Sequence, residues 1–160
     1  MGYLGAFAVV AAVFMTWREY SLLLGAELLW CRAFVSALTD MRAKMRCYLD
    51  SPRAWAEGYC GGPLEECGFL DLLREGVGVA EAYRGTRANM SLSDICDTLI
   101  TDCFSRLGEG YLDTELSLMD LTIDKLSSEE KRAAEELPRK RKAMGAVLGA
   151  CACGIVILVI

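Results

Sequence analysis

The chain has 160 residues, of which 54% are hydrophobic, and a formal net charge of −5. All 17 basic and 22 acidic residues lie within residues 18–142. The densest basic run, Arg139–Lys142, directly precedes an uncharged segment instead of forming a free basic arm. This pattern argues against nucleic acid as a partner.

The uncharged ends, residues 1–17 and 143–160, have the length and composition of membrane spans. Helices of this length reach ~25–27 Å, close to the ~30 Å hydrocarbon core of a bilayer. We therefore predict a transmembrane helix at 1–17, a soluble domain at 18–142 and a second transmembrane helix at 143–160. No basic residue precedes the first apolar stretch, unlike in a signal peptide, so we expect it to stay uncleaved.

Basic residues next to both predicted spans lie on the side of the soluble domain. These membrane-flanking anchors are Arg18, Arg139, Lys140, Arg141 and Lys142. Because loops rich in Lys and Arg stay in the cytoplasm, we predict a cytoplasmic middle and both termini at the outer face of the cell membrane.

Helical periodicity dominates the middle of the chain, and strand patterns are nearly missing from its sequence. Apolar side chains recur at i, i+3, i+4 and i+7 from residue 22 to residue 48, which is typical of an amphipathic helix. They are Leu22, Ala26, Leu29, Trp30, Ala33, Phe34, Ala37, Leu38, Met41, Met45 and Tyr48. Residues 1–51 contain no proline, so the first span is expected to continue into this helix.

The next elements are marked by caps and glycines. Ser51 and Pro52 predict the N-cap and first position of a short helix that ends near Tyr59. Residues 61–63, Gly-Gly-Pro, predict a turn before a further helix over residues 64–76.

The last soluble elements carry the clearest signals. Ser91–Asp94 predicts the start of a helix over 92–107, and Gly108 predicts its end. A heptad-like seam follows, at Leu112, Leu116, Met119, Ile123 and Leu126, continued by Ala133 and Leu137. This seam predicts an all-α fold, an antiparallel helical bundle, in which Pro138 kinks the last helix before the second span.

Small residues recur every four positions in both predicted spans: Gly145 and Gly149 in the second, Ala8 and Ala12 in the first. Small side chains let helix backbones approach closely in lipid. The spacing predicts that the spans pack on each other or on a neighbouring subunit of a homo-oligomer. The alternative is that Gly and Ala are simply common in spans.

The sequence offers no residues for common enzyme chemistry. It contains no histidine, which excludes Ser-His-Asp and Cys-His catalysis, and it has no nucleotide-binding glycine loop. We therefore predict a protein that is not an enzyme and has no cofactor, metal or small-molecule substrate.

The chain has eight cysteines. In a cytoplasmic domain they are not expected to form a disulfide scaffold, and Cys96 and Cys103, seven residues apart, are predicted to be small buried hydrophobes. A metal site of Cys60, Cys67, Cys96 and Cys103 is an alternative, although the spacing differs from that of zinc sites.

Several segments together resemble one protein family over essentially the full length. They are Leu4–Ala6 and Thr16-Trp17 in the first span, the Arg32–Tyr48 helix followed by Ser51-Pro52, Phe104–Gly108, the Leu112–Leu126 helix, and Lys140–Gly149 with its apolar tail. In these segments the chain resembles the stage III sporulation protein AB family of endospore-forming bacteria. Where that family has an Asp and a Gln after Leu107-Gly108, this chain has Tyr111 and Glu115.

The resemblance implies a helical domain similar to the cytoplasmic modules of type II secretion F proteins, the platform proteins of that system. It also implies a place in the stage III sporulation complex, in the mother-cell membrane facing the forespore. That complex resembles a secretion machine with a separate cytoplasmic ATPase, and the chain would be its membrane platform. Candidate contacts with the ATPase are the charged residues Arg42, Lys44 and Arg46.

Two other functions are compatible with these patterns. The first is a platform protein of a type II secretion or type IV pilus system, but such proteins usually repeat the module, and this chain has one copy. The second is a cysteine-based metal or redox protein.

Overall fold

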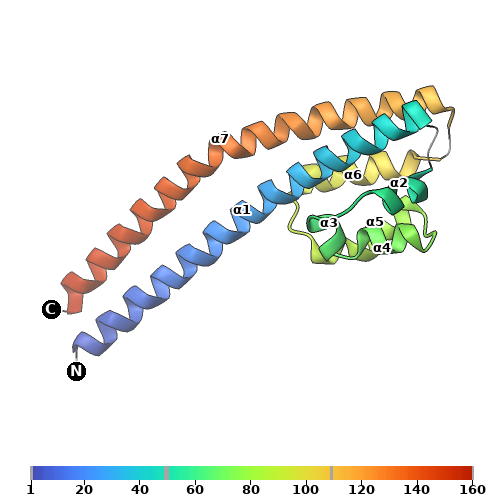
Figure 1. Cartoon of the computed structure of the whole chain (residues 1–160). Coiled ribbons are helices and arrows are strands. Elements are labelled where there is room, and N and C mark those ends of the chain that lie inside the picture. The colour runs from blue at the N-terminus through green and yellow to red at the C-terminus, as the bar shows by residue number, and fades with distance from the viewer. Residues whose placement is uncertain (1, 49–50, 109, 160) are drawn as a thin grey trace. The chain divides into compact units, whose positions relative to one another are not determined.

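The computed structural model describes residues 2–48, 51–108 and 110–159, with side chains described for residues 11–48, 51–108, 110–151 and 153–154 (Figure 1). The chain is 86% helical and no strand occurs in these segments, which confirms the predicted all-α class. The helices are α1 (Gly2–Tyr48), α2 (Pro52–Gly58), α3 (Pro63–Glu66), α4 (Phe69–Arg74), α5 (Val79–Thr86), the 3-10 helix η1 (Arg87–Asn89), α6 (Asp94–Arg106) and α7 (Leu112–Val159).

The helices form two compact units. The end unit combines residues 1–26 with residues 132–160, and the middle unit comprises residues 27–131. Helices α1 and α7 each contribute one part to each unit. The predicted domain borders, after residues 17 and 142, fall inside these two long helices.

Cap geometry confirms two predicted helix ends and moves a third by two residues. The Ser51 hydroxyl accepts a hydrogen bond from the Ala54 amide at 3.3 Å, and Pro52 occupies the first turn of α2. Helix α6 begins at Asp94, two residues after the predicted start, because Ser93 is its N-cap and accepts a hydrogen bond from the Cys96 amide at 3.4 Å. Gly108 follows α6 with φ +95°, a left-handed conformation that glycine adopts without steric cost and that commonly ends helices.

The prediction of one helix over residues 64–76 is wrong. Gly68 has φ +84° and lies between α3 and α4, so the chain turns there and starts a new helix. The apolar spacing alone could not show the break, because a left-handed glycine interrupts the backbone without changing which side chains are buried. Helix α5, which begins directly after Gly78, was not predicted, because Gly76 and Gly78 made the segment look irregular.

Four aromatic rings from four different helices form the centre of the middle unit. They belong to Phe34 of α1, Phe69 of α4, Tyr83 of α5 and Phe104 of α6, and each is at most 3% exposed. Phe34 lies 5.7 Å from Tyr83 and 6.2 Å from Phe69 between ring centroids, and Phe69 stacks on Phe104 at 5.8 Å. Such pairs stabilise a core beyond the area that they bury.

The predicted apolar stripe of α1 is correct in its centre and wrong at its ends. Phe34, Leu38 and Met41 are at most 1% exposed, whereas Leu29 is 53% exposed and Leu22 is 62% exposed. At about 100° per residue, Leu29 lies about 140° around the helix from Phe34, so the two cannot face the same core. Tyr48, 75% exposed, occupies the last position of α1.

Within the middle unit, α1 and the first part of α7 pair in antiparallel orientation. Arg32 bonds Glu130 at 2.7 Å, and Arg42 meets Asp120 at 2.5 Å, so residue numbers rise in opposite directions along the two helices. The predicted seam of α7 faces this core, since Met119 and Leu126 are fully buried. Helix α7 continues through Pro138 without interruption.

Candidate functional site

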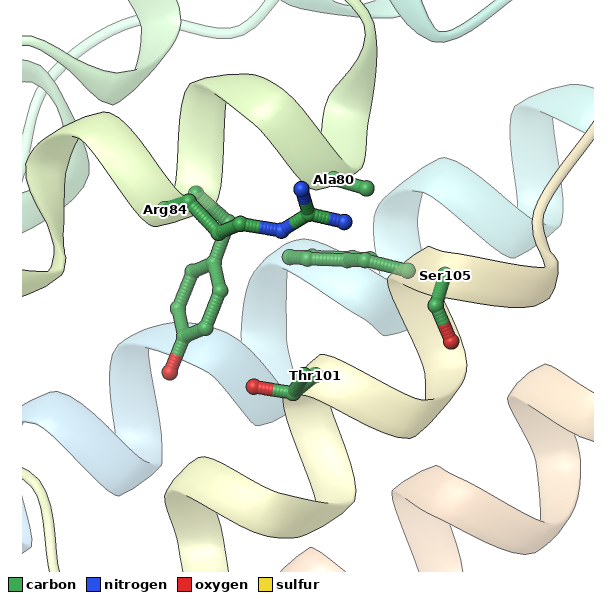
Figure 2. Close-up of a pocket in the computed structure, with 6 residues that line it drawn as sticks. Ala80, Arg84, Thr101 and Ser105 are labelled. Carbon is green, nitrogen blue, oxygen red and sulfur yellow. The ribbon is translucent and has the colours of Figure 1, made fainter.

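A small cavity lies between α5 and α6 in the middle unit and is too small for a substrate (Figure 2). It has a volume of about 10 Å³, roughly the space of one water molecule. Figure 2 shows Arg84 and Ala80 on one side and Thr101 and Ser105 of α6 on the other. The geometry at this place therefore serves packing.

The four cysteines of the alternative metal site are not gathered in the structure. Among the residues with described side chains, no group of three or more Cys, Asp or Glu is placed to hold a metal ion. Cys60 is exposed, Cys67 donates to the Leu64 carbonyl at 3.4 Å, and Cys96 and Cys103 are buried in α6. The prediction that Cys96 and Cys103 are buried is confirmed.

The three candidate contact residues of α1 differ in their surroundings. Arg42 donates to Asp120 of α7 at 2.9 Å, and its side chain is 31% exposed. Lys44 pairs with Asp40 at 3.2 Å, one turn earlier on α1. Arg46 is exposed, and no ion pair of Arg46 occurs among the described residues. Arg42 thus joins two helices of the middle unit, and Arg46 is the residue of the three that is open to a partner.

The end unit contains a pair of helix segments, one from α1 and one from α7. Arg141 donates to the Ser21 carbonyl at 3.2 Å. A Cβ atom added at Gly145 would lie 3.9 Å from Trp17 Nε1, an ordinary van der Waals distance. On both segments, half-buried side chains recur at heptad spacing: Val13, Trp17, Tyr20 and Leu24 on α1, and Leu137, Met144 and Leu148 on α7.

The predicted small residues are placed unequally in this pair. Gly145 faces Trp17, whereas Ala12 is exposed and nothing lies within 4 Å of the Cβ position of Gly149. Ala8 belongs to α1, but its side chain lies outside those that the structure describes.

All five predicted membrane anchors are exposed: Arg18, Arg139, Lys140, Arg141 and Lys142. Lys140 pairs with Glu136 at 2.9 Å, and Arg141 bonds the backbone of α1. Formal charges divide unevenly, since the end unit carries six basic and three acidic residues and the middle unit 11 basic and 19 acidic ones. The end unit is thus +3 and the middle unit −8.

Large apolar side chains are exposed along the end unit. Phe14 is 59% exposed, Met15 57%, Leu22 62%, Leu23 58% and Val147 58%. Water-soluble proteins rarely expose extended apolar patches without a partner or a membrane to cover them.

Among the described residues, one helical segment, Ala11–Tyr48, is long and apolar enough to cross a membrane. Its most apolar 18 residues have a mean hydropathy of 1.5, and 28% of them are buried. A signal sequence and a core helix of a soluble protein meet the same length and composition criterion, but a core helix is mostly buried.

A hydrogen-bonded cluster joins α5, η1 and α6. The Tyr83 hydroxyl donates to Asp97 at 2.8 Å, and the Arg87 guanidinium pairs with both oxygens of the same carboxylate. Arg87 first, and then the Tyr83 hydroxyl, hold the pKa of Asp97 below its usual value. Because Tyr83 also belongs to the aromatic centre, these hydrogen bonds hold α5 and η1 against α6 next to the core.

Two buried thiols from distant parts of the chain meet in the middle unit. Cys31 of α1 and Cys96 of α6 are 3% and 5% exposed, and their Sγ atoms lie 3.7 Å apart. The interaction between the two thiols, together with a hydrogen bond to Ser93, lowers the pKa of Cys96 to about 7. The same interaction with Cys96, followed by burial, raises the pKa of Cys31.

Sequence reasoning missed this pair. The available signal was the position of Cys31 three residues before Phe34, in the register of the buried stripe Phe34, Leu38, Met41 and Met45. The predicted stripe placed Leu29 and Trp30 there instead. The partner on α6 depends on the packing of two distant helices, which the sequence does not reveal.

Comparison with known proteins gave no significant match to a family model, a curated protein or a solved structure.

Proposed function

We propose that the chain is a membrane-anchored scaffold without enzymatic activity, in which both ends cross the bilayer and the helical middle unit binds partner proteins in the cytoplasm. The observation that carries this proposal is the exposure of large apolar side chains within the two predicted spans, namely Phe14, Met15 and Val147. Lipid would bury these side chains, at ~25 cal/mol for each Å² removed from water.

The charge distribution supports the orientation. The basic anchors lie at residues 18 and 139–142, on the side of the middle unit, as the positive-inside rule expects of a cytoplasmic domain. The heptad-spaced contact between α1 and α7 in the end unit supports two spans that associate with each other.

At the finer level we place the chain in the stage III sporulation complex of an endospore former, as the membrane platform that holds a cytoplasmic ATPase and other channel subunits. The support is the sequence resemblance in the first span, around Ser51-Pro52, at Phe104–Gly108 and in Lys140–Gly149. Its finer fold would be the helical bundle of type II secretion F modules. A platform of this kind works through contacts between proteins and requires no catalytic residues of its own.

The ion pairs of α1 indicate which of the three candidate residues is free to contact the ATPase. Arg42 and Lys44 bond within the middle unit, so reversing Arg42 would break its pair with Asp120 and disturb the fold. Arg46, exposed near the end of α1, is the better candidate for contact with an acidic patch of the ATPase.

The experiment is co-purification of the full-length chain, in detergent, with the cytoplasmic ATPase of the stage III sporulation complex. We expect Arg46→Glu to reduce ATPase recovery at least tenfold and the matched charge reversal Arg84→Glu, at an exposed position of α5, to leave it unchanged. Undiminished recovery with Arg46→Glu would remove this contact. If the wild-type chain recovers no ATPase at all, the platform assignment itself fails.

A further inference from the structure

The Cys31–Cys96 pair has the geometry of a dithiol that can close. Its sulfur atoms are 3.7 Å apart, at van der Waals contact, whereas a disulfide bond requires about 2.05 Å. The gap of less than 2 Å can be closed by small side-chain and helix shifts. Because the two cysteines are 65 residues apart, the bond would join helices that the chain connects only through α2–α5.

The surroundings give the two thiols different roles. Cys96 lies in the first turn of α6, three residues after its cap Ser93, where the helix N-terminus favours a negative charge. Cys31 lies against α7, with its Sγ 3.5 Å from the Leu126 carbonyl, and has no such position. Cys96 is therefore the thiol that reacts first, and Cys31 is the one that follows.

We propose that Cys31 and Cys96 form a reversible disulfide when the protein meets hydrogen peroxide, and that this bond ties α1 to α6 inside the middle unit.

The chemistry balances in two steps. The Cys96 thiolate attacks one peroxide oxygen, the O–O bond breaks, and the departing hydroxide takes a proton to leave as water, so Cys96 becomes a sulfenic acid. The Cys31 sulfur then attacks the Cys96 sulfur and loses its proton, and the displaced hydroxide leaves as a second water. Two thiols are oxidised by two electrons in all, and one peroxide is reduced to two waters.

Burial selects the oxidant. With the two residues 3% and 5% exposed, a small hydroperoxide reaches the sulfur atoms through modest opening of the helices, whereas a bulky disulfide such as oxidised glutathione is held off. The exposed thiols of Cys47 and Cys60 are open to both oxidants. A cytoplasmic thiol reductant would reverse the bond once the unit opens.

The test uses the full-length chain in detergent with Cys47, Cys60, Cys67, Cys151 and Cys153 replaced by alanine, which leaves three of its eight thiols. Trypsin with an endoproteinase that cleaves before Asp separates Cys96, in residues 94–96, from Cys103 and frees Cys31 in residues 19–32. We expect peroxide to lower the thiol count from three to one, to link residues 19–32 to residues 94–96, and to be reversed by dithiothreitol. Oxidised glutathione should act at least tenfold more slowly.

Two variants separate the proposal from general oxidation. Cys103→Ala, on the same face of α6, should leave the disulfide intact, whereas Cys31→Ala should leave a sulfenic acid on Cys96 that dimedone traps. The wild-type chain gives a second readout that depends on no substitution, because the same linked peptides should appear in its digest. A disulfide that involves Cys103 would overturn the proposal. So would a thiol count that stays at three at a peroxide concentration that oxidises Cys47 in the wild-type chain.

Discussion

Phe34 and Phe14 lie on the same helix, twenty residues apart, yet Phe34 is fully buried and Phe14 is 59% exposed. In the middle unit, three further aromatic rings surround Phe34. In the end unit, the ring of Phe14 has the ring of Trp17 at 6.0 Å between centroids. Two segments of one helix are thus covered in different ways, one by protein and one, in our account, by lipid.

The difference shows that hydrophobicity by itself does not identify a core. What separates the two regions is whether polar residues interrupt the apolar ones at helical spacing. Charged residues share α1 with Phe34, so only one stripe of that segment can be buried, whereas residues 1–17 are apolar on every side.

The largest expected effect comes from exchanging the two phenylalanines for alanine. Phe34→Ala removes a ring from the centre of the middle unit and should lower its free energy of unfolding by ~3–5 kcal/mol. Phe14→Ala should change that free energy by less than ~0.5 kcal/mol. Chemical denaturation of the detergent-solubilised chain, followed by circular dichroism, measures both, and equal losses would contradict the comparison.

A smaller effect is expected at the polar edge of the core. Asp97→Asn removes the charge that Tyr83 and Arg87 bond, and should lower the free energy of unfolding by about 1–2 kcal/mol at pH 7. Because the pKa of Asp97 is lowered in the folded chain, the stability that its charge contributes is full above its unfolded pKa of ~4 and is lost as the pH falls through the folded value. The difference from wild type should therefore shrink below pH ~4. The control Asp102→Asn, exposed on the same helix, should be near neutral at every pH.

The smallest effect concerns the helix pair of the end unit. Gly145→Ala places a methyl group at ordinary contact distance from Trp17 and should be neutral, whereas Gly145→Leu overfills the contact and should weaken the pair by ~1 kcal/mol. Oxidative cross-linking of Val13→Cys with Leu148→Cys in detergent reports the pairing, and we expect Gly145→Leu to reduce its yield several-fold. An equal fall in cross-linking yield with Gly145→Ala would contradict the contact between Gly145 and Trp17.

The sequence predicted those parts of the fold that short-range chemistry determines. Ser51, Ser93 and Gly108 act on backbone groups within a few residues, so their caps and turns could be predicted from local pattern. The seam of α7 was predictable because a heptad repeats over three turns or more. The left-handed Gly68 and helix α5 were missed, because glycines permit both a turn and a helix and the packing decides between them.

The candidate sites depended more on long-range packing and were predicted less well. The basic residues of α1 looked equivalent in sequence, and only the placement of Asp120 on α7 separates Arg42 from Arg46. The Cys31–Cys96 contact joins residues 65 apart and has no local signature. By contrast, the uncharged ends and their basic flanks are properties of composition and needed no structure to find.

The most direct test of the account is to wash membranes that contain the full-length chain with alkaline carbonate and then centrifuge them. Carbonate strips proteins that are held by charge but leaves those that lipid buries. We predict that the chain stays in the pellet with a known two-span protein, while a peripheral control protein is released. Recovery of the full-length chain in the supernatant would mean that Phe14, Met15 and Val147 are covered by protein, and the membrane scaffold would be wrong.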